Sequence, residues 1–175
     1  MNKQDTEILK IIKNFSEKLP HFPDGRINYS NSDTAPVLTC FLKYKDKILL
    51  LKRSDKVRTY QGKWNTVAGY LDEPKSIREK ALEEIQEELG IKENNILLIN
   101  IGKYYKFTDN EIEKHKTWIT CPVLVELKNE PEIRLDREHT RYKWISPKEL
   151  TNFDIVPKLD ESLKRVLENK IKVKL

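Results

Sequence analysis

The first part of the chain has apolar residues at helical spacing. They recur every three or four positions at Ile8, Leu9, Ile12, Phe15 and Leu19. This period predicts an amphipathic helix over residues 4–19. Pro20 interrupts the pattern, and a polar stretch continues to about residue 35. Residues 1–35 are too few to build a core of their own. We therefore expect a helix and linker that pack on a main domain over residues 36–175.

The main domain contains short apolar runs of strand length. The runs VLTCFLK (37–43) and KILLLKR (47–53) flank a turn-like segment and predict a β-hairpin. Further strands are expected over 63–68, 96–107, 117–127 and 142–145, and Pro122 indicates an edge strand or a bulge. Helical spacing predicts two more helices, over 76–89 and from about 157 to 168. Strands before and after one central helix, mostly antiparallel, predict an α+β layered fold.

Composition narrows the classes of function. The net charge is +5, which suits a phosphate-bearing ligand and equally suits simple solubility. Basic and acidic residues alternate, so we expect no nucleic-acid partner. No apolar run approaches the roughly 18 residues of a membrane span, and the N-terminus lacks the apolar core of a signal peptide. We therefore expect a cytoplasmic protein that acts without a membrane.

Two cysteines, Cys40 and Cys121, lie in apolar strand-like runs. Free cysteines are among the most buried residue types, and cytoplasmic thiols stay reduced. We therefore expect two buried core thiols. A disulfide between them and a catalytic thiol are the alternatives.

The central helix carries three carboxylates, Glu84, Glu87 and Glu88. In an α-helix these positions fall within about 100° of arc, so the side chains share one face. Like charges on one face repel each other. A hard divalent cation such as Mg²⁺ or Mn²⁺ removes that repulsion and prefers oxygen ligands. The alternative is an ordinary solvated acidic face.

The flanks of this helix favour the metal site. Gly69 ends the preceding strand, and Gly90 follows the helix at a natural C′ position. The whole segment from Gly69 to Ile91 resembles the Nudix box, in which G, five residues, E and seven residues precede R-E-U-x-E-E-x-G-U, with U aliphatic. The glycines, the three glutamates and the aliphatic positions align without a gap. Similarity extends over about residues 36–165.

The resemblance to the Nudix hydrolase superfamily implies both a fold and an activity. The implied fold is an α/β/α sandwich with a mixed, largely antiparallel sheet, here with an N-terminal helical extension. The implied activity is a metal-dependent pyrophosphohydrolase that cleaves a nucleoside diphosphate linked to another moiety: a nucleotide, a nucleotide sugar or an NTP. The alternative is a non-catalytic nucleotide-binding module. A homodimer is plausible, with the N-terminal helix as an extra contact.

The resemblance also implies roles for individual residues. Glu84, Glu87 and Glu88 would hold Mg²⁺ or Mn²⁺, helped by the backbone carbonyl of Ala68. The base that deprotonates the attacking water is a box glutamate or one from a later loop, for which Glu138 is the candidate. A lone surface charge is the other interpretation of Glu138. Arg53, at the end of an apolar strand, is a candidate phosphate ligand, and a surface ion pair is its alternative.

Two box positions depart from the family pattern. Lys75 stands where the box has its first glutamate, and Glu83 stands where it has arginine. The two changes together are a reciprocal charge swap. We predict an ion pair between Lys75 and Glu83 with reversed polarity. The competing interpretation is a weak or non-hydrolytic member of the family.

Overall fold

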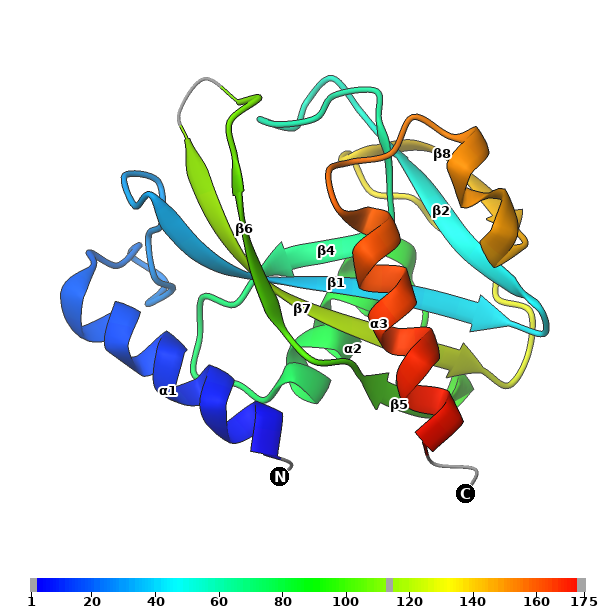
Figure 1. Cartoon of the computed structure of the whole chain (residues 1–175), viewed down its shortest axis with the longest axis horizontal. Coiled ribbons are helices and arrows are strands. Elements are labelled where there is room, and N and C mark those ends of the chain that lie inside the picture. The colour runs from blue at the N-terminus through cyan, green and yellow to red at the C-terminus, as the bar shows by residue number, and fades with distance from the viewer. Residues whose placement is uncertain (1–2, 113–114, 173–175) are drawn as a thin grey trace.

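Within the described residues, eight strands form one open mixed sheet with helices on both faces (Figure 1). The computed structural model describes residues 3–112 and 115–172. In chain order, the elements are α1 (Lys3–Lys18), β1 (Thr34–Tyr44), β2 (Lys47–Arg53), β3 (Trp64–Asn65), β4 (Val67–Tyr70), α2 (Ile77–Leu89), η1 (Glu93–Asn95), β5 (Ile96–Ile101), β6 (Tyr105–Asp109), β7 (Lys116–Leu127), β8 (His139–Ile145), η2 (Pro147–Asn152) and α3 (Leu159–Lys172).

The long strand β1 organises the sheet. It runs parallel to β7 from the Thr34–Thr117 pair to the Lys43–Glu126 pair. It also pairs antiparallel with β4, and with β2 next to their shared turn. The predicted hairpin is therefore confirmed, but its two strands separate beyond the turn. β2 goes on to pair with β3 and β8.

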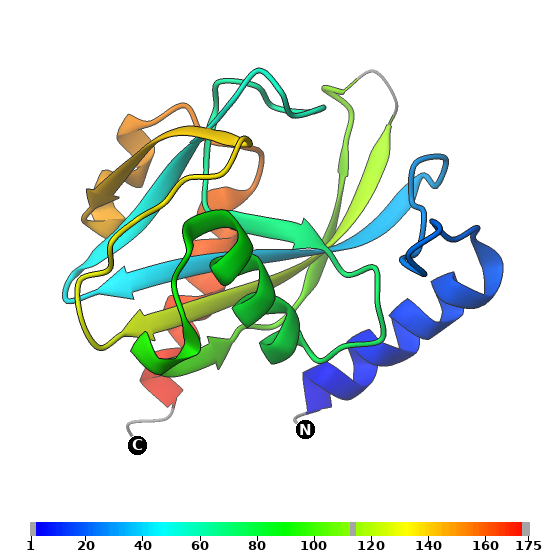
Figure 2. The ribbon, with the colours of Figure 1, turned by 180° about the vertical axis from the view of Figure 1, so that it is seen from behind.

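Two apolar layers hold the helices on the sheet. Leu38, Cys40 and Leu42 of β1 point to one face, where α1 and α2 pack. Phe41 points to the other face, where α3 packs. Figure 2 shows α2 on the face opposite to α3. The predicted α/β/α arrangement with an N-terminal helix is confirmed. Both cysteines are buried and free, as predicted.

The strand predicted over residues 63–68 is two strands with different partners. β3 pairs with β2, and β4 pairs with β1. Thr66 lies at the break and donates its hydroxyl to the Cys40 carbonyl oxygen at 2.7 Å. The apolar pattern runs across this break because both halves are buried, so the pattern alone does not reveal the change of partner.

The prediction that Pro122 marks an edge strand is wrong, whereas its alternative, a bulge, agrees with the irregular pairing at this position. β7 is an interior strand, with β1 on one side and β5 and β6 on the other. The pairing of β6 ends at Thr120 and that of β5 begins at Val123, so Pro122 lies between them. A missing backbone donor is tolerated at such a gap. The Pro122 carbonyl oxygen still accepts from Gly102 N at 2.8 Å.

The N-terminal helix caps the central helix. Ser76 and Glu79 form a capping box at the start of α2. Asp5 of α1 is buried, and its carboxylate accepts the backbone N–H of Ile77 at 3.0 Å. The first N–H groups of a helix have no acceptor within the helix. For Ile77, α1 supplies this acceptor from a residue 72 positions earlier in the chain.

Asp5→Ala is expected to lower the free energy of unfolding by about 1–2 kcal/mol, because it leaves the Ile77 N–H buried without an acceptor. Chemical denaturation measures this change. Glu7→Ala is the matched control, because Glu7 is a partly exposed acidic residue of the same helix that lies 4.0 Å from Lys3. Equal stability of the two variants would contradict the capping role.

No helix among residues 3–112 and 115–172 is long and apolar enough to cross a membrane.

Candidate active site

Gly69 lets the carboxylate of Glu84 lie against the backbone of β4. A Cβ atom added at Gly69 would stand 2.4 Å from Glu84 Oε1, closer than the 3.0 Å that real Cβ contacts respect. Close approach of a side chain to backbone is one reason a position requires glycine. The first box glycine therefore makes room for the first of the candidate metal ligands.

Glu88 is a buried carboxylate with one unsatisfied oxygen. Its side chain is 4% exposed, and Oε1 accepts from Ala68 N at 3.3 Å. Oε2 has no hydrogen-bond partner within the described part of the chain. Burial, followed by the charges of Glu84, Asp136 and Glu138, raises the pKa of Glu88 well above its ordinary value. The charged form of Glu88 therefore needs a compensating cation.

The three box glutamates diverge more than helical geometry indicates. Glu84 contacts Lys80, Glu88 contacts β4, and Glu87 is exposed. Burial, opposed by Lys80, raises the pKa of Glu84, and the Glu87 charge adds to the rise. Within the two described segments, no three Asp, Glu, His or Cys side chains are gathered closely enough to hold a metal ion as they stand. The donor chemistry nevertheless fits a hard divalent cation, because the charges of three other carboxylates act on Glu88, whose Oε2 accepts no hydrogen bond from the described residues.

The segment between β7 and β8 brings further groups to Glu88. Arg134 N and Asp136 N donate to the carbonyl oxygens of Leu89 and Glu88, at 3.0 and 3.2 Å. These bonds satisfy carbonyls at the C-terminal end of α2, and Figure 2 shows the segment passing beside this helix. The same turn places Asp136, which we did not predict from the sequence, close enough to Glu88 to raise its pKa.

His139 is also part of this cluster. It is 6% exposed, with Nδ1 at 3.0 Å from Asp136 Oδ1 and Nε2 at 3.8 Å from Glu88 Oε2. Burial lowers the pKa of His139, while Asp136 and Glu138 oppose that effect. His139 contacts two carboxylates because the segment at residues 134–138 lies against α2.

Arg53 and Glu138 meet where β2 pairs with β8. Arg53 lies opposite His139, and Ser54 N donates to the Glu138 carbonyl oxygen at 2.7 Å. Arg53 Nε donates to the Thr59 carbonyl oxygen at 3.0 Å, which orients the guanidinium. Burial lowers the pKa of Arg53, while Glu138 and Glu88 raise it. Arg53, Glu138 and Glu88 are therefore close enough for the two carboxylates to act on the charge of the guanidinium.

The predicted ion pair between Lys75 and Glu83 is confirmed. Lys75 Nζ lies 2.9 Å from Glu83 Oε1 and 2.9 Å from Glu73 Oε2. Hydrogen bonds to Glu73 and then to Glu83 raise the pKa of Lys75. The box loop, residues 71–76 between β4 and α2, is therefore tied to α2 with the charges exchanged. The swap does not break the contact.

Glu83→Lys is expected to destabilise the protein, because the new ammonium would face Lys75 and Lys80. Adding Lys75→Glu should recover part of the loss. Both side chains are about one-third exposed, at 35% and 32%, so we expect a coupling energy of only about 0.5–1 kcal/mol. Denaturation of the two single variants and the double variant measures it. Additive effects would contradict the reversed ion pair.

The N-terminal segment also braces the box loop. Tyr29 Oη donates to the Leu71 carbonyl oxygen at 2.9 Å, and Ile27 N donates to the Asp72 carbonyl oxygen at 2.9 Å. Arg26 lies 3.8 Å from the Asp72 carboxylate. Residues upstream of β1 thus hold the loop that leads into α2. The sequence pattern indicated packing of this segment but not its target.

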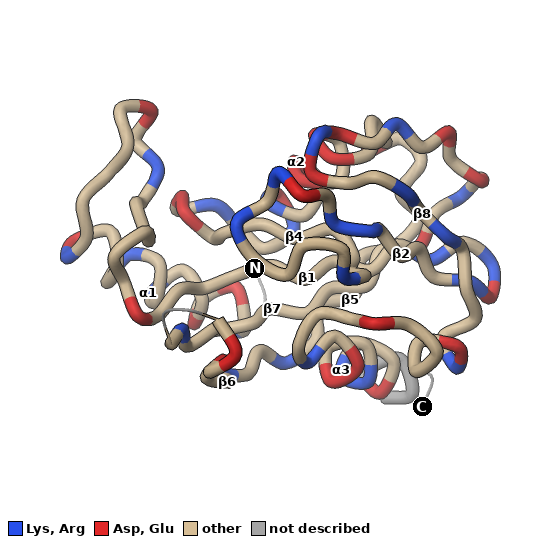
Figure 3. The backbone as a smooth tube through the Cα atoms, turned by 90° about the horizontal axis from the view of Figure 1, so that it is seen from above, with Lys and Arg blue, Asp and Glu red and all other residues tan. Residues whose placement is uncertain are grey.

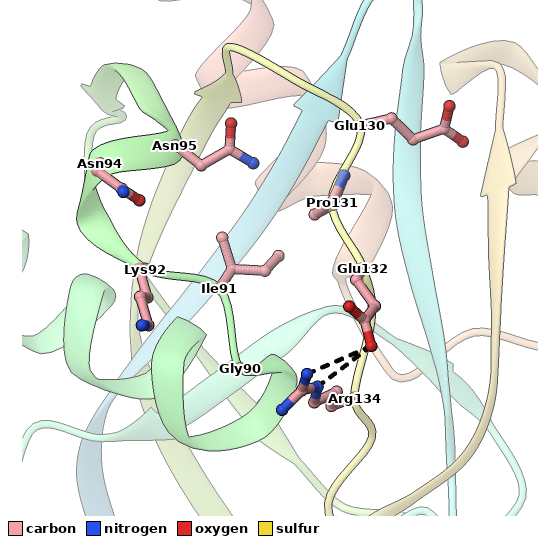
Figure 4. A pocket seen from close by; sticks show the side chains of 9 residues that line it. All are labelled: Gly90, Ile91, Lys92, Asn94, Asn95, Glu130, Pro131, Glu132 and Arg134. Atoms are coloured by element: carbon pink, nitrogen blue, oxygen red, sulfur yellow. Dashed lines mark hydrogen bonds and ion pairs between the residues drawn. The ribbon is translucent and has the colours of Figure 1, made fainter.

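Charges of both signs are interspersed along α2 (Figure 3). A hollow of about 340 Å³ lies beyond its C-terminal end (Figure 4). Its exposed residues Arg134 and Glu132 pair with each other at 3.4 Å. Glu84, Glu87, Glu88, Arg53 and Glu138 do not line this hollow. The candidate active site instead lies where β4, α2 and the turn before β8 meet.

Comparison with known proteins agrees with this geometry. The NUDIX domain family matches residues 34–168. The asymmetrical bis(5'-nucleosyl)-tetraphosphatase of Rattus norvegicus is 30% identical over 100 residues, which cover 57% of this chain and 63% of that protein. This chain thus matches less than two-thirds of the relative's length.

Solved structures show the same fold. The MutT protein of Methanosarcina mazei Go1 has a TM-score of 0.63 and 22% identity, covering 80% of this chain and 97% of that one. A C. elegans Ap4A hydrolase binary complex has a TM-score of 0.58 and 17% identity, covering 79% of this chain and 98% of that one. The sequence match spans more than half of the chain and includes the strand, loop and helix described above. The chain therefore belongs to the NUDIX domain family.

Proposed function

We propose that this protein is a pyrophosphohydrolase, dependent on Mg²⁺ or Mn²⁺, that cleaves a nucleoside diphosphate linked to another moiety. The observation that carries the proposal is the buried Glu88 Oε2, which has no hydrogen-bond partner among the described residues and lies close to the charges of Glu84, Asp136 and Glu138. Such a group of carboxylates is stable when a divalent cation offsets its charge. The rat relative is named for a dinucleoside tetraphosphate, so diadenosine tetraphosphate is the first substrate to test.

The metal ligands in this proposal are Glu84, Glu87 and Glu88, with the carbonyl oxygen of Ala68. A bound divalent ion supplies positive charge to the diphosphate oxygens and acidifies water. Asp136 joins the proposed set, because its carboxylate also acts on Glu88.

The remaining residues act on the water and the phosphate. Glu138 takes the proton of the attacking water. Its backbone is held on both sides, since its carbonyl oxygen accepts from Ser54 N and its N–H donates to Asp136 Oδ1. Arg53 binds a phosphate oxygen with the N–H groups that do not contact Thr59. Both residues lie beside Glu88, which supports a shared role.

Product analysis by chromatography tests the activity on diadenosine tetraphosphate, nucleotide sugars and NTPs, with Mg²⁺ or Mn²⁺. We expect release of a nucleotide from at least one substrate, and no release in a chelator. Nucleotide binding without turnover would favour the non-catalytic module. The intact Lys75–Glu83 ion pair supports the enzyme over that alternative.

A cytoplasmic location is part of the proposal. It is supported by the two buried, free cysteines, since reduced thiols are typical of that compartment. The homodimer stays a prediction.

A further inference from the structure

Lys80 is a buried lysine inside the carboxylate cluster. It is 6% exposed, although lysine is almost never buried without a partner. Its ammonium lies 2.8 Å from Glu84 Oε1, 3.4 Å from Asp72 Oδ1 and 3.6 Å from Glu83 Oε2. Three carboxylates therefore share one internal cation.

These carboxylates come from two elements, the box loop and the helix α2. Asp72 belongs to the loop and is 7% exposed, and its Oδ1 has no hydrogen-bond partner among the described residues. Glu84 belongs to α2 and lies against Gly69. Burial on all sides keeps the ammonium in place, in contrast to the partly exposed ammonium of Lys75.

We propose that the charge of Lys80 lowers the affinity of the metal site for its ion. Lys80 contacts one oxygen of Glu84 and offsets the charge of that carboxylate from within the protein. This inference rests on the proposed function, because it takes Glu84 as a metal ligand. A positive charge beside a ligand carboxylate repels a divalent cation, and in a buried site that repulsion is screened little.

A purely structural role makes a different prediction. If Lys80 only joined the loop to the helix, its loss would loosen Glu84 and weaken metal binding or leave it unchanged. If Lys80 acts through its charge, its loss makes the site more negative and binding becomes tighter. Metal affinity therefore separates the two roles without reference to turnover.

The test is a titration with Mn²⁺, in which electron paramagnetic resonance reports the free ion. Lys80→Met should bind Mn²⁺ at least about tenfold more tightly than the wild type. Lys80→Arg retains the charge and should stay within about threefold of the wild type. Lys116→Met is the matched control. Lys116 is also buried, but its ammonium contacts the carbonyl oxygens of Tyr29 and Ser32.

Unchanged or weaker Mn²⁺ binding by Lys80→Met would overturn the inference, and so would equal tightening by Lys116→Met. If the wild type bound no Mn²⁺ at millimolar concentration, the proposed metal site itself would fail and the inference with it. If Lys80→Met does not fold, the Mn²⁺ affinities are compared in the Asp72→Asn background. This second substitution removes the Asp72 carboxylate, which would otherwise stay buried without the Lys80 ammonium. There, Asp72→Asn/Lys80→Met must still bind Mn²⁺ more tightly than Asp72→Asn, and equal affinities would overturn the role.

Discussion

Glu88→Gln is expected to lower kcat/KM for the hydrolysed substrate by about 10³-fold and to make the metal-free protein more stable. The loss of activity follows because an amide keeps the shape of the side chain but removes a charge that the proposed metal site requires. The gain in stability, about 1–3 kcal/mol, follows because Glu88 is 4% exposed and one oxygen has no hydrogen-bond partner within the described residues. Steady-state kinetics and thermal unfolding in a chelator measure the two effects.

The same variant should also lose its response to metal. If Mg²⁺ binds the folded wild type as proposed, it should raise the Tm of the wild type, whereas the Tm of Glu88→Gln should change little. Glu93→Gln is the control, because Glu93 is exposed and pairs with Arg78 at 3.0 Å outside the candidate site. A Glu88→Gln variant with near wild-type turnover would remove Glu88 from the candidate site.

Gly69→Ala is expected to lower kcat/KM by about 10²-fold with a change of less than about 1 kcal/mol in the free energy of unfolding. The added methyl would meet only the carboxylate end of Glu84 within 3.0 Å. A flexible side-chain end can move aside, and the buried Lys80 keeps its contacts with Asp72 and Glu83, so the cost in stability is small. Glu84 nevertheless leaves its position beside Lys80. Kinetics together with chemical denaturation separate the two quantities.

The contact with Glu84 can be tested directly by a double-mutant cycle. In a Glu84→Ala background the clash is absent, so Gly69→Ala should cause little further loss of activity. An equal loss in both backgrounds would show that the glycine acts through something other than Glu84.

Much of the architecture could be predicted from local pattern. The helix α2 followed from its apolar spacing and from Gly90 at its C′ position, whose left-handed geometry the structure confirms. The ion pair of Lys75 with Glu83 followed from a charge swap within one motif. These features depend on residues close together in the chain, where helical geometry determines which side chains meet.

Other features could not be predicted from the sequence, because they depend on contacts between segments that are far apart in the chain. The parallel pairing of β1 with β7 joins residues about 83 positions apart, from Thr34 to Thr117. It makes β7 an interior strand, which tolerates Pro122 because that residue lies between the pairings of β6 and β5. Asp136 and His139 reach Glu88 only because the turn before β8 bonds to the end of α2. No local period marks such contacts.

Lys80 has one feature that is visible in the sequence and another that only the tertiary structure shows. Its spacing of four residues from Glu84 is visible in the sequence and is compatible with an ordinary surface ion pair. Its burial, and the third carboxylate from Asp72, come from the packing of the box loop on the helix. The sequence alone determined the family, the helix and its glutamates, because helical period and motif spacing are local. The tertiary structure decided that one oxygen of Glu84 pairs with Lys80 and that one oxygen of Glu88 has no hydrogen-bond partner among the described residues. These pairings depend on how strand, loop and helix pack on one another.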